Sequence, residues 1–158
     1  MILTLIEHDR GVISPYSLQL LTRVRELSSK ENTPIKAVLI GENVQPLVFE
    51  LSTYGLDGIF LIHDDRLENY NAEAWAEGVI QLAEATKPVL IMAAATDKGN
   101  EVLSHIGARL DLPMSTNTST LLLGDNNKLI RYRWGSSLLE EAVIKAKPLL
   151  LTLALNLV

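Results

Sequence analysis

Short apolar runs alternate with amphipathic segments up to residue 110, and this alternation constrains the fold more than any other feature. The runs have the composition of strands buried on both faces, and each is followed by apolar side chains at helical spacing. This order predicts an α/β fold with a mostly parallel sheet and right-handed crossovers. The predicted strands are residues 2–6, 35–40, 58–62 and 89–95, and the predicted helices are residues 14–29, 44–54, 72–85 and 99–110.

Turn-forming residues stand at the predicted boundaries. Ser14-Pro15 combines a good N-cap with the residue best suited to a first helical turn. Gly41 ends the second strand, and Gly55 is expected to cap the second helix in a left-handed conformation. Pro88 precedes the fourth strand. These residues support the predicted order of elements.

The pattern changes after Pro113. Two β-rich segments, residues 118–123 and 128–134, flank a hairpin-type loop at residues 124–127, and a last apolar strand is predicted at 149–155. We therefore expect antiparallel strands near the C-terminus. The composition of residues 136–146 suits a helix and their position suits a strand, so both remain open. A single domain is expected over residues 1–158.

Charge and composition exclude several classes of function. The chain has 158 residues, no Cys, and 14 Lys and Arg against 19 Asp and Glu, which gives a formal net charge of −5. No basic run is present to bind nucleic acid, and the absence of Cys excludes disulfides and thiolate chemistry. The apolar stretches are far shorter than the roughly 20 residues that span a bilayer. Because the first residues do not resemble a signal peptide, a cytoplasmic or organelle-matrix location is expected, without membrane insertion.

Candidate binding residues lie after the predicted strands, because the carboxyl edge of a parallel sheet is its usual functional edge. The loops expected to converge there are residues 7–13, 41–44, 63–66 and 96–101. The loop at 96–101 opens a helix whose free N–H groups could hold an anion, although it has no phosphate-loop motif. A plain turn capped by Thr96 or Asp97 is the other interpretation. The candidate residues for an anion or nucleotide are Gly41, Glu42, Thr96, Gly99 and Asn100.

Two polar clusters contain residue types found in metal and catalytic sites, but their spacing in the sequence does not predict such a site. His63-Asp64-Asp65 has metal-ligand residue types, but adjacent residues at a strand end point in different directions. Glu7-His8-Asp9 lies near Ser14, yet no nucleophile-elbow motif accompanies them. We predict neither a metal site nor a catalytic residue.

The remaining aromatic and imidazole side chains favour structural roles. Trp75 lies on the apolar stripe of a predicted helix and Trp134 at a strand end, so burial or an interface is favoured over stacking on adenine or flavin. His105 is expected to flank an apolar helix face, partly covered.

A series of short motifs, taken in order, resembles one known family. The chain is similar to the N-terminal domain of the electron transfer flavoprotein alpha subunit over essentially all 158 residues. The motifs are Glu7-His8-Asp9-Arg10-Gly11, Ala37-Val38-Leu39-Ile40-Gly41, Tyr54-Gly55-Leu56-Asp57, residues 70–76, Lys87-Pro88, Ala94-Ala95-Thr96 with Gly99, Ala108-Arg109-Leu110 and Lys147-Pro148.

The resemblance implies a three-layer, nucleotide-binding-like domain of the adenine nucleotide alpha hydrolase type. It also implies part of a heterodimeric electron carrier, in which alpha and beta subunits together hold FAD and pass electrons from dehydrogenases to an acceptor. In that family the FAD lies mainly in a C-terminal domain of the alpha subunit. This chain would be scaffold and interface for the beta subunit, with no flavin of its own. A stand-alone AMP- or ATP-binding or sensory module is the alternative.

The chain departs from the family pattern at several positions. These departures indicate a divergent member or a fragment, and flavin contacts carry over to no residue. An apolar tail, Leu155-Asn156-Leu157-Val158, suggests a segment that something follows or covers, and the isolated chain could self-associate. The departures are Gly99-Asn100 and Ser104-His105 in place of a basic residue and Pro-Arg, Asn117 for Asp, Gly135-Ser136-Ser137 for Gly-Gly-Asn, and Leu153-Ala154-Leu155 where an Arg is usual.

Overall fold

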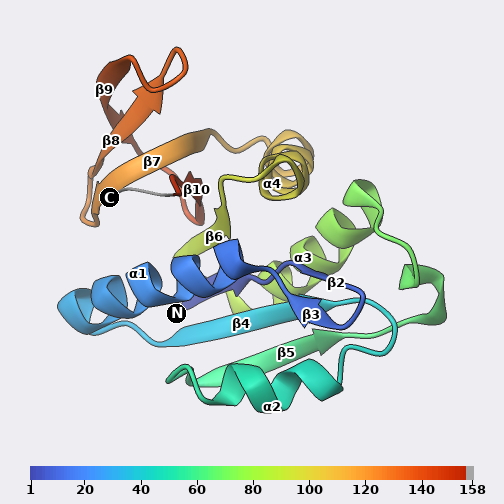
Figure 1. The fold of residues 1–158 in the computed structure, drawn as a ribbon. Helices are drawn as coiled ribbons and strands as arrows, with labels where there is room; N and C mark the ends of the chain where they lie inside the picture. The colour runs from blue at the N-terminus through green and yellow to red at the C-terminus, as the bar shows by residue number, and fades with distance from the viewer. Residues whose placement is uncertain (156–158) are drawn as a thin grey trace.

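The computed structural model describes residues 1–155 and contains an eight-stranded sheet in the order β5-β4-β1-β6-β10-β7-β8-β9 (Figure 1). The tail at residues 156–158 lies outside the described residues. The strands are β1 (Ile2–Leu5), β2 (His8–Asp9), β3 (Val12–Ile13), β4 (Ile35–Ile40), β5 (Gly58–Ile62), β6 (Leu90–Ala94), β7 (Met114–Leu122), β8 (Asn127–Arg133), β9 (Leu138–Ile144) and β10 (Leu149–Leu153). The helices are α1 (Pro15–Glu31), α2 (Pro46–Ser52), α3 (Ala72–Thr86), α4 (Asp97–Leu110) and the 3-10 turn η1 (Asp65–Leu67).

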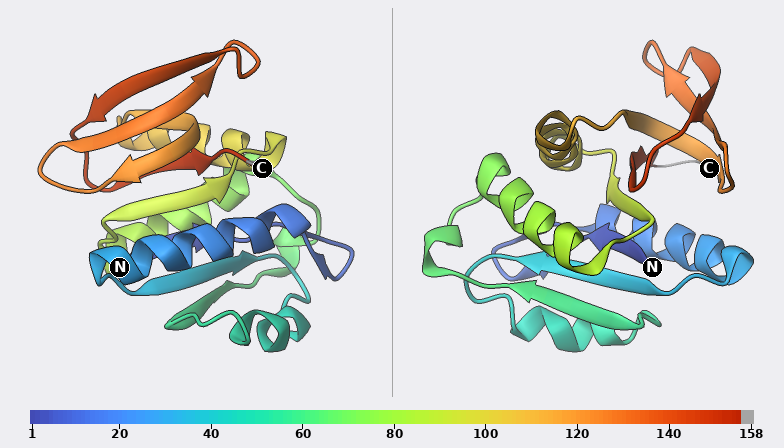
Figure 2. Two further views of the ribbon diagram at one scale, coloured as in Figure 1. Left: turned by 60° about the vertical axis from the view of Figure 1, so that its left-hand side comes forward. Right: turned by 180° about the vertical axis from the view of Figure 1, so that it is seen from behind.

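The parallel half of the sheet confirms the predicted α/β alternation. Strands β5, β4, β1 and β6 pair in parallel, with α1 and α2 on one face and α3 and α4 on the other (Figures 1 and 2). Alternate residues of β1 pack into the hydrophobic cores on the two faces of the sheet. Leu3 and Leu5 pack against α3 and α4, whereas Ile2 packs against α1. Burial on both faces explains why these strands are continuous apolar runs.

Helix boundaries follow from local capping. Helix α1 is capped by Asn32, which follows its last residue, adopts a left-handed φ of 49° and donates its N–H to the Ser28 carbonyl oxygen. Helix α4 begins two residues before the predicted start, because the Thr96 side chain accepts a hydrogen bond from the Gly99 N–H at 2.9 Å. Helix α2 is shorter than predicted: Pro46 stands at its start, and it ends at Ser52, before Gly55.

The C-terminal strands resolve what the sequence left open. Strands β7, β8 and β9 are antiparallel, so the expected antiparallel strands are present and the ambiguous segment at 136–146 forms a strand. The last strand, β10, does not extend this antiparallel end. It inserts between β6 and β7 and runs parallel to both. All five of its residues are buried, with Leu150 in the core on one face of the sheet and Leu149, Leu151 and Leu153 in the core on the other.

Two features differ from the sequence predictions. The loop at residues 7–13 contains a small hairpin of β2 and β3, which no periodicity in so short a segment could reveal. Trp134 was predicted to be buried or to lie in an interface. The prediction of burial is wrong, because 81% of the Trp134 surface is exposed just beyond the end of β8. Trp75 and His105 are buried and partly covered, as predicted. Among residues 1–155, no helix is long and apolar enough to cross a membrane.

Candidate functional site

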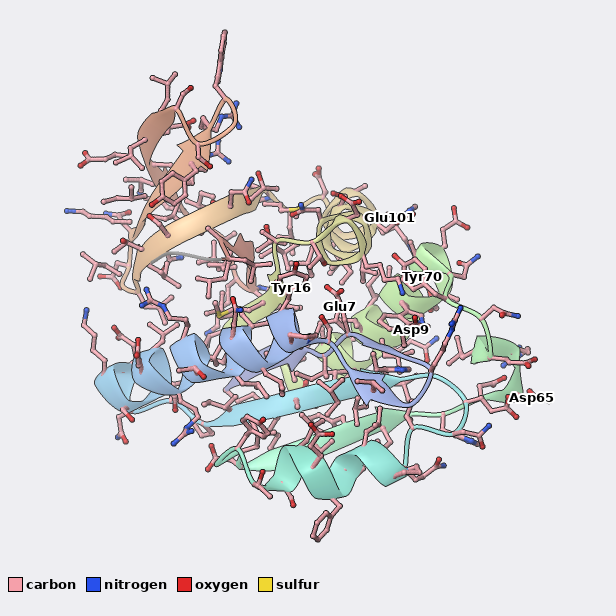
Figure 3. The ribbon with its side chains drawn as sticks, viewed as in Figure 1. Glu7, Asp9, Tyr16, Asp65, Tyr70 and Glu101 are labelled. Carbon is pink, nitrogen blue, oxygen red and sulfur yellow. The ribbon has the colours of Figure 1, made fainter. Side chains whose placement is uncertain are left out.

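The candidate site lies at the carboxyl edge of the parallel strands, where three of the four predicted loops meet. The end of β1 supplies Glu7 and His8, the end of β4 supplies Gly41, and the start of α4 supplies Thr96 and Lys98. Figure 3 shows Glu7 near the starts of α1 and α4. Asp65, which belongs to the predicted loop at residues 63–66, lies well away from Glu7.

Glu7 is the most buried acidic residue of this edge, with 7% of its surface exposed. Its Oε1 accepts a hydrogen bond from the Thr96 hydroxyl, and its own backbone N–H donates to Ser17 Oγ at 2.8 Å. Burial raises the pKa of Glu7 above the usual 4.5, and this rise is opposed by Thr96, by the nearby Lys98 ammonium and by the Gly99 backbone N–H. Glu7 therefore joins the first strand to α1 and α4.

A second group beside Glu7 links α4 to the segment before α3. The Tyr70 hydroxyl donates to Glu101 Oε2 at 3.1 Å, and the Lys98 ammonium lies 4.7 Å from the centre of the Tyr70 ring. Burial, then the hydrogen bond and charge of Glu101, and then the charge of Glu7 raise the pKa of Tyr70. The phenol is consequently a hydrogen-bond donor at neutral pH, and Lys98 lies between aromatic and acidic neighbours.

His8 is held by structural contacts. Its Nε2 lies 2.6 Å from the Ile40 carbonyl oxygen, and its ring stacks on Trp75 with centroids 5.7 Å apart. Gly41 has a φ of 144° and packs so closely that a Cβ there would lie 3.3 Å from His8 Cε1. Glu42 is half-buried in the bend after Gly41. The Gly41 loop thus packs against His8, and it does not line the cleft described below.

Asn100 is turned into the fold. Its Oδ1 accepts a hydrogen bond from the buried Thr152 hydroxyl at 2.7 Å, and Thr152 Oγ1 in turn accepts from the Asn117 N–H at 3.2 Å. Asn117 has a left-handed φ of 51° at an irregularity of β7. This chain of hydrogen bonds connects α4, β10 and β7.

The side chains of the two polar clusters noted in the sequence make local structural contacts. Asp64 pairs with Arg66 at 2.6 Å, and that hydrogen-bonded partner lowers the pKa of Asp64. Ser14 caps α1, with its Oγ accepting from the Tyr16 N–H at 3.3 Å, while His8 faces Ile40. In residues 1–155, no group of three or more His, Asp and Glu is placed to hold a metal ion.

A cleft of about 520 Å³ opens at this edge. Its lining contains three carboxylates, from Glu7, Asp9 and Asp97, and one ammonium, from Lys98. FAD, the cofactor that the resemblance implies for the alpha subunit, carries a pyrophosphate that would face these carboxylates. The cleft therefore does not fit the phosphates of FAD. The N-terminus of α4 is already in contact with the Glu7 carboxylate, so it attracts a further anion only weakly.

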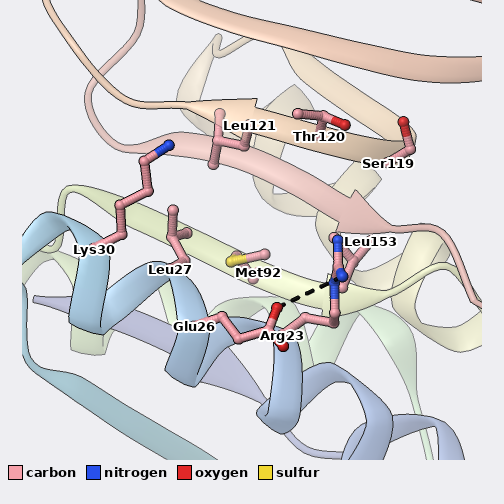
Figure 4. Close-up of a pocket in the computed structure, with 9 residues that line it drawn as sticks. All are labelled: Arg23, Glu26, Leu27, Lys30, Met92, Ser119, Thr120, Leu121 and Leu153. Atoms are coloured by element: carbon pink, nitrogen blue, oxygen red, sulfur yellow. Dashed lines mark ion pairs between the residues drawn. The ribbon is translucent and has the colours of Figure 1, made fainter.

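A second hollow of about 200 Å³ lies between α1 and β7 (Figure 4). Arg23 and Glu26 form an ion pair of 3.6 Å at its wall, and Met92 and Leu153 lie among its apolar residues. It lies apart from the carboxyl edge and shares no residue with the first cleft.

The family model for the electron transfer flavoprotein domain matches residues 2–158. The chain belongs to the electron transfer flavoprotein family. This membership agrees with the motif series that begins at Glu7-His8 and ends at Lys147-Pro148. The observed α/β fold, with antiparallel strands near the C-terminus, is the one that the resemblance implied.

Several curated proteins are similar to most of the chain. The electron transfer flavoprotein subunit alpha of Thermoanaerobacterium thermosaccharolyticum is 29% identical over 127 residues, which are 80% of this chain and 38% of that protein. The lactate dehydrogenase (NAD(+),ferredoxin) subunit LctC of Acetobacterium woodii is 26% identical, covering 87% and 34%. Protein FixB of Bradyrhizobium diazoefficiens is 25% identical, covering 85% and 38%. The chain spans little more than a third of the length of these relatives.

Sequence reasoning missed the contacts that define this edge. Glu7 was noted in a polar cluster, in an edge loop and in the first family motif, but nothing in the local sequence shows that its carboxylate reaches Thr96. The one available signal was the place of Glu7 at a strand end, opposite the predicted anion loop. Tyr70 lies in a family motif and Glu101 in an edge loop, but no pattern pointed to the contact between them. The roles of Gly41, Glu42, Thr96, Gly99 and Asn100 in binding a ligand stay predictions.

Proposed function

We propose that this chain is the scaffold and interface part of an electron transfer flavoprotein alpha-type subunit. It supports FAD-mediated electron transfer from dehydrogenases to an acceptor, and it carries no redox group itself. The observation that carries this proposal is the family match over residues 2–158, together with relatives named as alpha subunits. The FAD belongs to the complete complex in this proposal.

The side chains of the carboxyl edge support a carrier component over a catalyst. Groups that could act as nucleophile or base are engaged in holding the fold: Ser14 caps α1, and His8 contacts the Ile40 carbonyl. The acidic cleft disfavours nucleotide phosphates, so the alternative of an AMP- or ATP-binding module is not favoured. The cytoplasmic location stays a prediction from the sequence.

The partner in this proposal is a beta-type subunit, and the sheet of β7, β8 and β9 offers a surface for it. Figure 2 shows these strands at the end of the sheet opposite α2. The strands expose large apolar side chains, and within residues 1–155 β9 is an edge strand, with one row of backbone groups that pairs with no other strand. The same surface gives the isolated chain a route to self-association. The exposed residues on one face of these strands are Leu122 (47%), Leu139 (66%) and Val143 (57%).

Co-purification with a beta-type subunit tests the partner assignment. We expect the two chains to co-elute in gel filtration, and we expect Leu139→Glu, opposite Tyr132 of β8, to abolish co-elution by placing a charge among exposed apolar side chains. Phe49→Glu is the matched control, since Phe49 is 82% exposed on α2, at the opposite end of the sheet. Co-elution lost equally in both variants would contradict this surface, and failure of the unsubstituted chains to co-elute would contradict the partner.

The visible absorption spectrum tests the cofactor assignment. The purified chain should be colourless, and heat denaturation should release no flavin. A yellow protein would mean that this chain holds FAD by itself, and the scaffold proposal would be wrong. Stabilisation by AMP or ATP would instead favour the nucleotide-binding alternative, because a ligand raises stability in proportion to its binding.

A further inference from the structure

The N-terminus of α4 faces a carboxylate that belongs to the protein itself. The start of a helix after a parallel strand presents free N–H groups and the positive end of the helix dipole, which favour an anion. We propose that Glu7 is an internal anion at α4, which takes the place that a ligand phosphate would otherwise occupy. This edge of the sheet is then complete without a nucleotide.

The contacts of the Glu7 carboxylate resemble those of a bound anion. Thr96 donates its hydroxyl to Glu7 Oε1, and the same hydroxyl oxygen accepts from the Gly99 N–H at 2.9 Å. Gly99 allows this approach, since a Cβ there would lie 3.2 Å from Glu7 Oε1. The carboxylate therefore lies against the first turn of α4, within reach of the groups that a phosphate would use.

The main chain of Glu7 is fixed from the opposite side. Its N–H donates to Ser17 Oγ at 2.8 Å, and its carbonyl oxygen accepts from the Ser14 N–H at 2.8 Å. Both partners belong to the start of α1. Because β1, α1 and α4 all hold this residue, a free anion would have to displace a tethered carboxylate, which has a large advantage in effective concentration.

The charges around the site also exclude a second anion. Asp9 and Asp97 line the same cleft, so a phosphate would meet three carboxylates and a single ammonium, that of Lys98. Removal of the Glu7 side chain changes this balance. It leaves the Thr96 hydroxyl and the Lys98 ammonium facing an empty position at the first turn of α4, and these groups form a donor set for inorganic phosphate or a phosphomonoester.

Opening the position by mutation tests the proposal on the full chain. We compare the thermal midpoint in inorganic phosphate and in sodium chloride of the same ionic strength. The unsubstituted chain should show no difference. The thermal midpoint of Glu7→Ala should rise in phosphate, and this variant should bind phosphate about tenfold more tightly than the unsubstituted chain does. Glu7→Gln should not gain, because its amide fills the same space.

The control variant is Asp97→Asn, which removes an exposed carboxylate from the same helix end and leaves Glu7 in place. It should show no gain in phosphate. An equal gain in Asp97→Asn and Glu7→Ala would show that net charge alone decides, and would overturn the proposal. A Glu7→Ala variant that folds and gains nothing would also overturn it.

An NMR titration of the unsubstituted chain tests the proposal even if Glu7→Ala does not fold. The ¹⁵N amide signal of Gly99 is followed while phosphate is added. A saturable shift would mean that the position is open to a ligand and would overturn the proposal, whereas no shift supports it. Neither reading depends on flavin or on the partner subunit, so failure here is distinguishable from failure of the proposed function.

Discussion

The close approach of α4 to β6 makes Gly99→Ala the sharpest test of the described edge. A Cβ at Gly99 would lie 2.0 Å from the Ala94 carbonyl oxygen, whereas real Cβ atoms essentially never come closer than 3.0 Å. The obstacle is backbone, so no side-chain rotation relieves it. The first turn of α4 must move away from β6 by a substantial part of that difference.

The expected loss of stability combines three effects. Forcing atoms into a packed site costs about 1–3 kcal/mol, and loss of the Thr96 cap costs about 1 kcal/mol. Alanine returns up to about 1 kcal/mol through its higher helix propensity. The net expectation is a loss of about 1–4 kcal/mol, which lowers the thermal midpoint by about 2–16 °C in a domain of this size.

Urea unfolding followed by circular dichroism measures this loss. Gly124→Ala is the control, because the nearest heavy atom to its added Cβ is 3.9 Å away. The control should change the free energy of unfolding by less than about 0.5 kcal/mol. A Gly99→Ala variant as stable as this control would refute the described seating of α4 on β6.

Three further predictions concern single side chains. Thr152→Val should lower the free energy of unfolding by about 2–3 kcal/mol, because it leaves Asn100 Oδ1 and the Asn117 N–H without their partner. Thr4→Val is its control in the same urea titration and should be nearly neutral, since the Thr4 hydroxyl is buried without a hydrogen-bond partner. Ser136→Gly should raise the urea midpoint, by about 0.5–1 kcal/mol in stability, because Ser136 has a φ of 68°; an unchanged midpoint would contradict strain there. Finally, the raised pKa of Glu7 means that the folded state holds its proton to a higher pH than the unfolded state, so stability falls as pH rises from about 4.5 through the raised value. Urea titrations across this range should show less of that fall in Glu7→Gln, and equal slopes would argue against a buried, ionising Glu7.

The candidate site was predictable in place but not in its contacts. The rule that loops after parallel strands share an edge brought Glu7 and Thr96 together and set Gly41 against His8, whereas the loop at residues 63–66 lies away from them. Thr96 as the N-cap of α4 was one of the two interpretations that the sequence allowed. The contact between Glu7 and Thr96 spans 89 residues, and that between Thr152 and Asn100 spans 52. No local pattern encodes such pairs, because they depend on how the strands are ordered.

The alternation of strands and helices was determined by the sequence alone. Apolar periodicity and capping residues act over a few residues, so they are visible without the fold, as at Ser14 for α1 and Thr96 for α4. Tertiary structure decided where β10 inserts and what the carboxyl edge holds. Insertion of β10 between β6 and β7 buries all five of its residues, and only the completed sheet offers that position. The Glu7 carboxylate likewise reaches α4 only because β1 and β6 are neighbours, a relation that arises when residues distant in the chain pack together.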